Sequence, residues 1–201
     1  MFRNMFAAIA LSLALGGQAA ADPITQDPAR VPAGDYALDP RHASLLVKVP
    51  HMGGFSQFVI RFDTLAGAFT YDPANWGATR AVITVDAASL RTNVSGFDKT
   101  LTGPSYLNVG KHPTITFAAT KVEGDPARGV VHGDLTFLGV TKPVDLDVVF
   151  NGVGPSLLGA GTRLGFSGAT RIKRSDFGLS TMSSMAGDDL ELMFEVEFTR
   201  K

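Results

Sequence analysis

Alternation of apolar and polar residues with a period of two dominates this chain from Tyr36 to Phe198. The clearest stretch is 190–198, where leucine, phenylalanine and valine alternate with glutamate and methionine. Such a pattern is typical of a β-strand with one buried face and one solvated face. Similar alternation predicts further strands over 36–39, 45–49, 58–62, 65–71, 81–86, 114–122, 129–138, 144–150 and 163–173.

Residues 133–144, which read GDLTFLGVTKPV, predict a β-hairpin. Leu135 and Phe137 alternate with their neighbours, and Gly139 permits a tight turn. Pro143 would open the second strand, a position where its missing N–H is tolerable.

Two stretches break the alternation. Residues 89–109 contain Gly96, Gly103 and Pro104 and predict a loop with one or two short helical turns, and 152–161 predicts a glycine-rich loop. We expect the alternating stretches to form eight or nine strands joined by short turns, without a long helix, which favours a β-sandwich or an up-and-down barrel. A barrel of about eight strands is just wide enough to be filled by side chains or to hold one small ligand.

The N-terminus has the features of a secretory signal peptide. Arg3 precedes an apolar run over 6–15, and Ala19-Ala20-Ala21 supplies a small-residue cleavage site. About ten apolar residues are too few for a membrane span, which needs roughly 20. We therefore expect a signal peptide over 1–21, a flexible leader over 22–33, one domain over 34–201, and export from the cytoplasm.

Composition excludes several classes of site. The chain has no cysteine, which excludes disulfides, thiolate chemistry and cysteine-bound zinc. Without a run of lysine and arginine, nucleic acid is not an expected partner. The four histidines are dispersed, G-x-S-x-G is absent, and the adjacent Asp188 and Asp189 would point to opposite faces of a strand. We therefore predict no metal site and no catalytic residues.

Five short motifs occur in an order that resembles the YceI-like family. Besides GDLTFLGVTKPV they are YALD followed by His42, HMG at 51–53, KHPTITF at 111–117 and RSDFG at 174–178. The resemblance covers about residues 34–199. Two positions depart from the family: FDKTL at 97–101 stands where R-D-x-H-L is common, and Ile60 stands where glycine is frequent.

The resemblance implies a mainly β fold, an extended eight-stranded antiparallel barrel of lipocalin type with one or two short helices. It also implies a periplasmic protein that binds a long isoprenoid lipid, such as an isoprenoid quinone or a polyprenyl phosphate, with no other cofactor and no assigned catalysis. A homodimer and transient contact with a membrane follow from the resemblance alone.

A polyisoprenoid is nearly all hydrocarbon, so apolar lining can supply the affinity. At roughly 0.8 kcal/mol for each buried CH₂, a tail of about 40 carbons has a gross driving force of tens of kcal/mol. Fourteen phenylalanines provide candidate lining, although many of them would simply fill the core. The candidates for contact with the lipid are Phe55, Phe58, Phe62, Phe69, Phe117, Phe137, Phe166, Phe177, Met182 and Met185.

Three polar residues complete the predicted site. His42 and His51 are expected to satisfy loops or to touch a ligand head group, and Arg174 to attract an anionic head group or to pair with Asp176. The sequence therefore favours a carrier or store for an isoprenoid lipid. A hydrolase or isomerase acting on a lipid inside the barrel, and a packed barrel that serves protein contacts under stress, stay open as alternatives.

Overall fold

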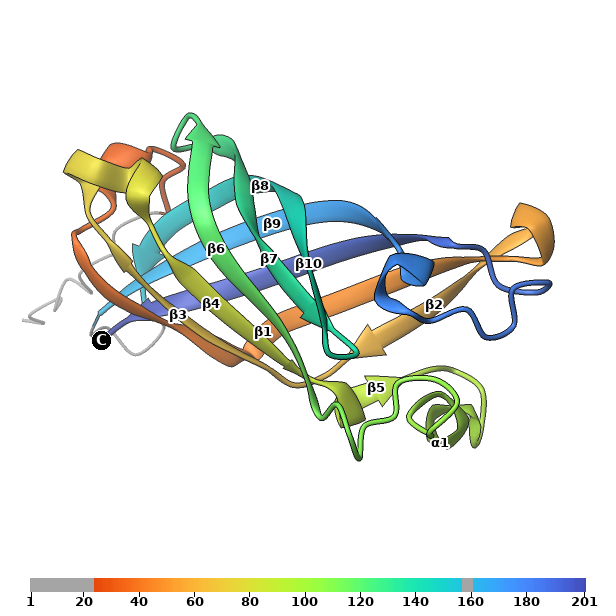
Figure 1. Ribbon diagram of the computed structural model, residues 1–201. Coiled ribbons are helices and arrows are strands. Elements are labelled where there is room, and N and C mark those ends of the chain that lie inside the picture. Colours follow the sequence, from red (N-terminus) through yellow and green to blue (C-terminus); the bar gives the residue numbers. More distant parts are fainter. Residues whose placement is uncertain (1–23, 157–160) are drawn as a thin grey trace, which may run out of the picture.

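The computed structural model describes residues 24–156 and 161–201, and a ten-stranded antiparallel sheet makes up most of it (Figure 1). The strands are β1 (Gly34–His51), β2 (Ser56–Phe62), β3 (Leu65–Tyr71), β4 (Ala81–Asp86), β5 (Leu90–Arg91), β6 (Thr114–Gly124), β7 (Arg128–Phe137), β8 (Val140–Pro155), β9 (Thr162–Lys173) and β10 (Asp189–Arg200). The helical segments are α1 (Phe97–Leu101) and the 3-10 turns η1 (Pro28–Arg30), η2 (Met52–Gly54), η3 (Pro73–Ala78), η4 (Ala87–Ser89) and η5 (Arg174–Phe177).

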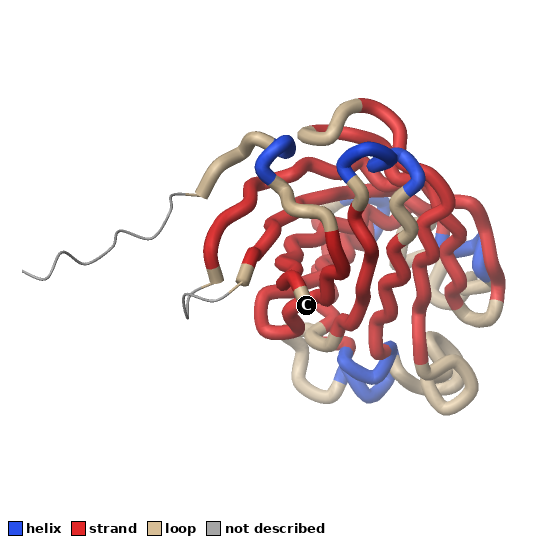
Figure 2. The backbone as a smooth tube through the Cα atoms, turned by 90° about the vertical axis from the view of Figure 1, so that its left-hand side faces the viewer, coloured by secondary structure: helices blue, strands red, loops and turns tan. Residues whose placement is uncertain are grey.

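The sheet closes on itself through β1, which pairs with β10 on one side over most of its length. On its other side, the first part of β1 pairs with β3 and the last part pairs with β2. The closed circuit is therefore β1-β3-β4-β6-β7-β8-β9-β10, and β2 and β5 extend it at one end. The predicted eight-stranded antiparallel barrel is confirmed, as the end-on view in Figure 2 shows.

The barrel has two unlike ends. The proximal end carries η1, η3, the β6–β7 turn and the C-terminus (left in Figure 1). The distal end carries the tip of the β1–β2 hairpin, α1 with its flanking loops, the β7–β8 turn and the segment between β9 and β10. At about 3.3 Å for each residue, a strand of twelve residues such as β9 or β10 is roughly 40 Å long. The interior is correspondingly elongated.

The hairpin at 133–144 forms with a two-residue turn at Leu138 and Gly139, whose φ angles are 51° and 77°. Positive φ at both central residues matches the right-handed twist of the flanking strands. The second strand begins at Val140 and not at Pro143, so the predicted start is wrong by three residues. Pairing between β8 and β9 begins only at Asp147. Pro143 therefore has no paired residue on β9, and its missing N–H interrupts no hydrogen-bond ladder on that side.

Other boundaries also differ from the prediction. The strands predicted at 36–39 and 45–49 are one strand, β1, whose register with β10 shifts between Leu38 and Ala43. Residues 152–155 continue β8, so the predicted glycine-rich loop is wrong there. The predicted loop over 89–109 holds β5 and the short α1.

The described part of the predicted leader is attached to the barrel. Thr25 exchanges two backbone hydrogen bonds with Val153, at 3.0 and 2.8 Å, and Val31 is buried in the core. The structure therefore shows residues 25–31 against the proximal end of the barrel. The predicted signal peptide over 1–21 lies outside the described residues.

Inward-facing glycines make room for large side chains in the barrel. Gly168 of β9 lies directly opposite Phe194 of β10. A Cβ at Gly168 would lie 2.1 Å from Cζ of Phe194 and 2.8 Å from the carbonyl oxygen of Asp147. The ring of Phe194 therefore covers a position that only glycine can occupy. Gly133 is equivalent, because a Cβ there would lie 2.3 Å from Cζ of Phe117.

Arg174 organises the segment between β9 and β10. Its side chain is buried, and Nε donates to the carbonyl of Gly187 at 2.9 Å. Its Nη atoms donate to three further carbonyls of the same segment, those of Leu179, Thr181 and Ala186, at 2.9, 2.7 and 2.9 Å. The remaining RSDFG residues also act locally: Ser175 bonds to the carboxylate of Asp188, and Gly178 ends η5 with φ 82°. This motif therefore fixes the shape of the distal end.

We predict that Gly168→Ala lowers the free energy of unfolding by about 1–3 kcal/mol, because the new methyl group collides with Phe194 and with a backbone carbonyl. Urea denaturation followed by circular dichroism measures the change. Gly165→Ala in the same strand is the control, since a Cβ there meets nothing closer than Asn151 Cβ at 3.5 Å. Equal stability of the two variants would contradict this account.

We predict that Arg174→Lys lowers the free energy of unfolding by about 2–3 kcal/mol, because an ammonium group cannot reach four carbonyls arranged around a planar guanidinium. Limited proteolysis should also cut within 178–187 faster than in the unaltered protein. The same replacement at the exposed Arg171 on β9 is the control. Unchanged stability and cleavage at Arg174→Lys would show that the four hydrogen bonds contribute little.

Candidate functional site

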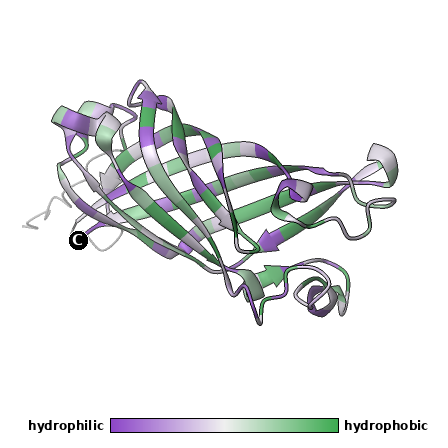
Figure 3. Cartoon of the chain, viewed as in Figure 1, coloured by the Kyte–Doolittle hydropathy of each residue, from purple (hydrophilic) through white to green (hydrophobic). Residues whose placement is uncertain are grey.

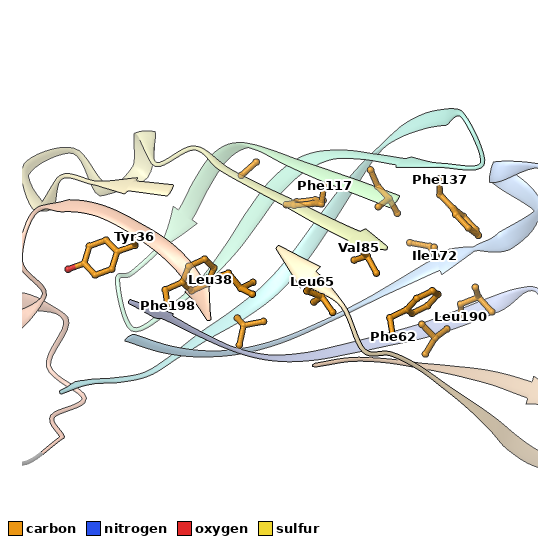
Figure 4. Packing of buried hydrophobic residues seen from close by; sticks show 14 of the residues in the cluster. Tyr36, Leu38, Phe62, Leu65, Val85, Phe117, Phe137, Ile172, Leu190 and Phe198 are labelled. Atoms are coloured by element: carbon orange, nitrogen blue, oxygen red, sulfur yellow. The ribbon is translucent and has the colours of Figure 1, made fainter. Parts of the chain in front are cut away.

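An apolar cavity of about 670 Å³ occupies the interior of the barrel. Every strand contributes to its wall, and alternate residues point inward as the period-two pattern requires. Figure 3 shows this alternation as hydrophobic bands along the strands, and Figure 4 shows inward side chains from Tyr36 to Leu190 along the barrel. This volume is within the usual range for small-molecule pockets, about 300–1,000 Å³.

Aromatic rings gather in the proximal half of the interior. Phe69 stacks on Tyr36 with a centroid distance of 5.2 Å and meets the edge of Phe198 at 4.9 Å. Phe166 lies 6.3 Å from Phe69 and 5.5 Å from Phe150. These five rings pack against one another, and all but Tyr36 also line the cavity.

Loop residues cover the distal half of the cavity. Phe97 of α1 meets Phe58 of β2 edge to face at 5.7 Å, and both line the cavity. Leu101, Tyr106 and Leu107 line it from the same segment, and Leu107 is buried. The segment between β9 and β10 completes this part of the wall with Thr181, Met182, Met185 and Ala186.

Ten of the predicted site residues line this cavity: Phe58, Phe62, Phe69, Phe117, Phe137, Phe166, Met182, Met185, His51 and Arg174. They come from six strands, η5 and the segment after it, so the fold brings together residues that are far apart in sequence. Their contact with a lipid stays a prediction.

The other three predicted residues lie elsewhere. Phe55 is at the tip of the β1–β2 hairpin with 92% of its surface exposed, because Gly53 and Gly54 adopt positive φ and turn the chain away from the barrel. Phe177 is 2% exposed and packs behind the cavity wall, 5.6 Å from Phe137. His42 belongs to a separate polar hollow on the outer surface.

That outer hollow lies where β1 bulges away from β10. Nδ1 of His42 is 2.9 Å from Oδ2 of the buried Asp39, and Nη2 of Arg163 is 3.3 Å from the same oxygen. The hydrogen bond from His42 is the main reason why the pKa of Asp39 is well below its usual range. The carboxylate therefore stays charged at neutral pH, and this group stabilises the bulge on the outside of the barrel.

Arg174 has little capacity left for a head group. Its hydrogen bonds to four carbonyls use four of the five N–H bonds of a guanidinium. Asp176, the alternative partner considered from the sequence, is absent from the ion pairs of the described residues. The contacts present are those of a residue that shapes the wall.

Polar chemistry is sparse in the cavity. Burial raises the pKa of the Tyr71 hydroxyl, which is therefore neutral at physiological pH. Asp125, at the proximal rim, is the one carboxylate among the described lining residues. Within 24–156 and 161–201, no cluster of three histidine or acidic side chains could hold a metal ion, and no helix is long and apolar enough to cross a membrane. The arrangement suits an apolar guest held by shape.

The apolar residues predicted from the sequence to line the cavity were all phenylalanine or methionine, so the prediction omitted much of the wall. Aliphatic residues supply a large share of it, among them Leu45, Val47, Ile83, Leu146 and Leu192. The period-two pattern could have identified these positions, since each of them lies on the apolar face of a predicted strand. Phe97, Leu101 and Tyr106 could not have been found this way, because their segment has no periodicity.

Comparison with known proteins agrees with this architecture. The model of the YceI-like domain matches residues 36–198. A UPF0312 protein of Vibrio cholerae serotype O1 is 40% identical over 167 residues, which cover 81% of this chain and 87% of that protein.

Two solved structures share the fold. Burkholderia cenocepacia BcnA superposes with a TM-score of 0.69 at 21% identity, over 80% of this chain and 98% of that one. A polyisoprenoid binding domain from Saccharophagus degradans, implicated in plant cell wall breakdown, superposes with a TM-score of 0.62 at 16% identity, over 83% and 98% of the two chains. At these identities the likeness concerns the fold. Because the family model spans nearly all of the barrel and the Vibrio relative is 40% identical, this chain belongs to the YceI-like family.

Proposed function

We propose that this protein is a periplasmic carrier or store for a long isoprenoid lipid, either an isoprenoid quinone or a polyprenyl phosphate, held without chemical change in the barrel cavity. The observation that carries the proposal is the elongated cavity of about 670 Å³, whose wall is apolar over nearly its whole length. The fold is that of a family with a polyisoprenoid-binding member among its structural neighbours, which supports a lipid as the guest.

The energetics of such a guest fit the wall. Each CH₂ that leaves water contributes roughly 0.8 kcal/mol, and practical affinities are nearer 0.3 kcal/mol for each ligand atom. Either value allows tight binding without a charged clamp. Methionines at the distal side, such as Met182, can adapt to the irregular outline of a branched tail.

The structure bears differently on the two alternative functions, a packed barrel for protein contacts and a lipid-modifying enzyme. A packed barrel for protein contacts is hard to reconcile with the cavity. A lipid-modifying enzyme needs an acid or base facing the guest, and among the described lining residues His51 and the carboxylate of Asp125, in the turn between β6 and β7, are the candidates. Analysis of the extracted lipid for conversion products would reveal an enzyme.

Extraction of the protein from its own cell envelope tests the proposal directly. Native mass spectrometry should show a complex with one isoprenoid lipid, and organic extraction should identify it. Cell fractionation should place the processed protein, without residues 1–21, in the periplasm. A protein that is consistently free of lipid, or that holds only phospholipid, would contradict the proposed cargo.

We predict that Leu146→Trp weakens isoprenoid binding by about tenfold or more, because the larger side chain occupies space inside the cavity. Titration with a fluorescent isoprenoid analogue measures the loss. Asp147→Trp adds the same side chain to the exposed outer face at the next position, and it should bind like the unaltered protein. Equal binding by both variants would place the lipid outside the barrel.

A further inference from the structure

Apolar side chains project into solvent at the tip of the distal end. Met52 and Phe55 in the β1–β2 hairpin are 61% and 92% exposed, and Met185 in the segment before β10 is 43% exposed. The hairpin and that segment lie side by side, because the backbone N–H of Met52 donates to the carbonyl of Met185 at 2.7 Å. The three side chains therefore form one small apolar tip.

Charged residues are absent from the sequence around this tip. Residues 49–60, 100–110 and 177–187 contain no aspartate, glutamate, lysine or arginine. The three segments are joined in space: Gly187 donates to the carbonyl of Pro50 at 2.7 Å, and the hydroxyl of Thr181 donates to the carbonyl of Ser105 at 2.7 Å. These three segments thus present an uncharged surface of serine, threonine, glycine and exposed apolar residues, and the charges of the distal end, such as Lys99 of α1 and Asp176 of η5, lie outside them.

The proximal end has the opposite character. Exposed charged residues surround it, among them Asp27, Arg30, Asp72, Arg80 and Arg128. Charges resist transfer into the apolar part of a bilayer, whereas phenylalanine and methionine favour it. The proximal end therefore favours contact with water, and the apolar tip of the distal end favours contact with a lipid surface.

The apolar tip is continuous with the cavity. Pro50 and His51, which precede the tip, line the cavity, and so do Met185 itself and Ala186 beside it. A guest that leaves a bilayer at the tip can reach the cavity along an apolar path without crossing a charged rim.

We propose that the distal end is a membrane-docking surface, which inserts Met52, Phe55 and Met185 into one leaflet of a phospholipid bilayer so that the distal part of the cavity wall faces the lipid. This inference rests on the proposed function, since an isoprenoid lipid resides in bilayers. The exposed apolar residues are few and project from loop tips. A stable protein interface needs about 800 Å² on each partner, whereas insertion into a bilayer needs only a projecting apolar tip.

Flotation with vesicles of pure phosphatidylcholine, which contain no isoprenoid, tests docking apart from cargo binding. Phe55→Asp should reduce the vesicle-bound fraction by about tenfold or more, because the apolar contact is replaced by a charge. Ile24→Asp removes a side chain that is 75% exposed on the opposite part of the molecule and should float like the unaltered protein. Failure of the unaltered protein to float, or an equal loss in both variants, would overturn the proposal.

Fluorescence locates the contact. The single tryptophan, Trp76, lies in η3 at the proximal end, so vesicles of brominated phosphatidylcholine should leave the emission of the unaltered protein unchanged. The additional emission of the Phe55→Trp variant should be quenched by these vesicles. Quenching of the unaltered protein instead would mean that the proximal end meets the membrane.

Two measurements separate this proposal from the proposed function. Binding of an isoprenoid analogue in solution should be within about twofold for Phe55→Asp and the unaltered protein, because Phe55 lies outside the cavity. Docking without isoprenoid binding would refute the cargo and leave the docking surface. Isoprenoid binding without docking would refute the docking surface and leave the proposed cargo.

Sedimentation tests a further occupant of the tip. A dimer that Phe55→Asp dissociates, without any change in flotation, would assign the tip to a second copy of the chain and overturn docking.

Discussion

Backbone pairing between β1 and β10 is the interaction on which the rest of the structure depends, because it converts a sheet into a barrel. Without closure, two strand edges would expose unpaired N–H and C=O groups, and the apolar face would have nothing to cover it. With closure, that face encloses a space. The length of β1 allows it to pair with β3 at one end and with β2 at the other, which carries the barrel wall beyond the closed circuit to the distal end.

The interior combines filled and unfilled regions. Contacts among Tyr36, Phe69, Phe150, Phe166 and Phe198 occupy the proximal half, and glycines opposite Phe117 and Phe194 let rings lie against the wall. The cavity wall is apolar, and four of these five rings, all but Tyr36, belong to it. Stability and binding therefore use the same side chains, since the residues that hold the barrel together also present the surface that an oily guest would contact.

Charge is distributed along the barrel axis in a way that gives the molecule a direction. Charged residues surround the proximal end, whereas the three segments around the distal tip, 49–60, 100–110 and 177–187, contain no acidic or basic residues. Arg174 lies near that uncharged end but is directed inward at carbonyl oxygens, so that it holds the loop in place without presenting a charge at the surface. The proposed docking of one end to a bilayer depends on this asymmetry.

The strands and their inward faces could be predicted from the residue pattern, because alternation is a local property of any β-structure with one buried face. The sequence also indicated the eight-stranded barrel through the order of the family motifs, and most of the phenylalanines in the wall through the high phenylalanine content of the chain. Three positions could be seen only in the folded chain. Phe55 points away from the barrel at a glycine turn, Phe177 lies behind the cavity wall, and His42 faces an outer bulge. The same holds for Arg174, whose partners come from a loop folded back over it, and for Phe97 and Tyr106, which reach the cavity from a segment without periodicity. These outcomes depend on positive φ angles, strand register and loop packing, which are set by contacts between residues distant in sequence.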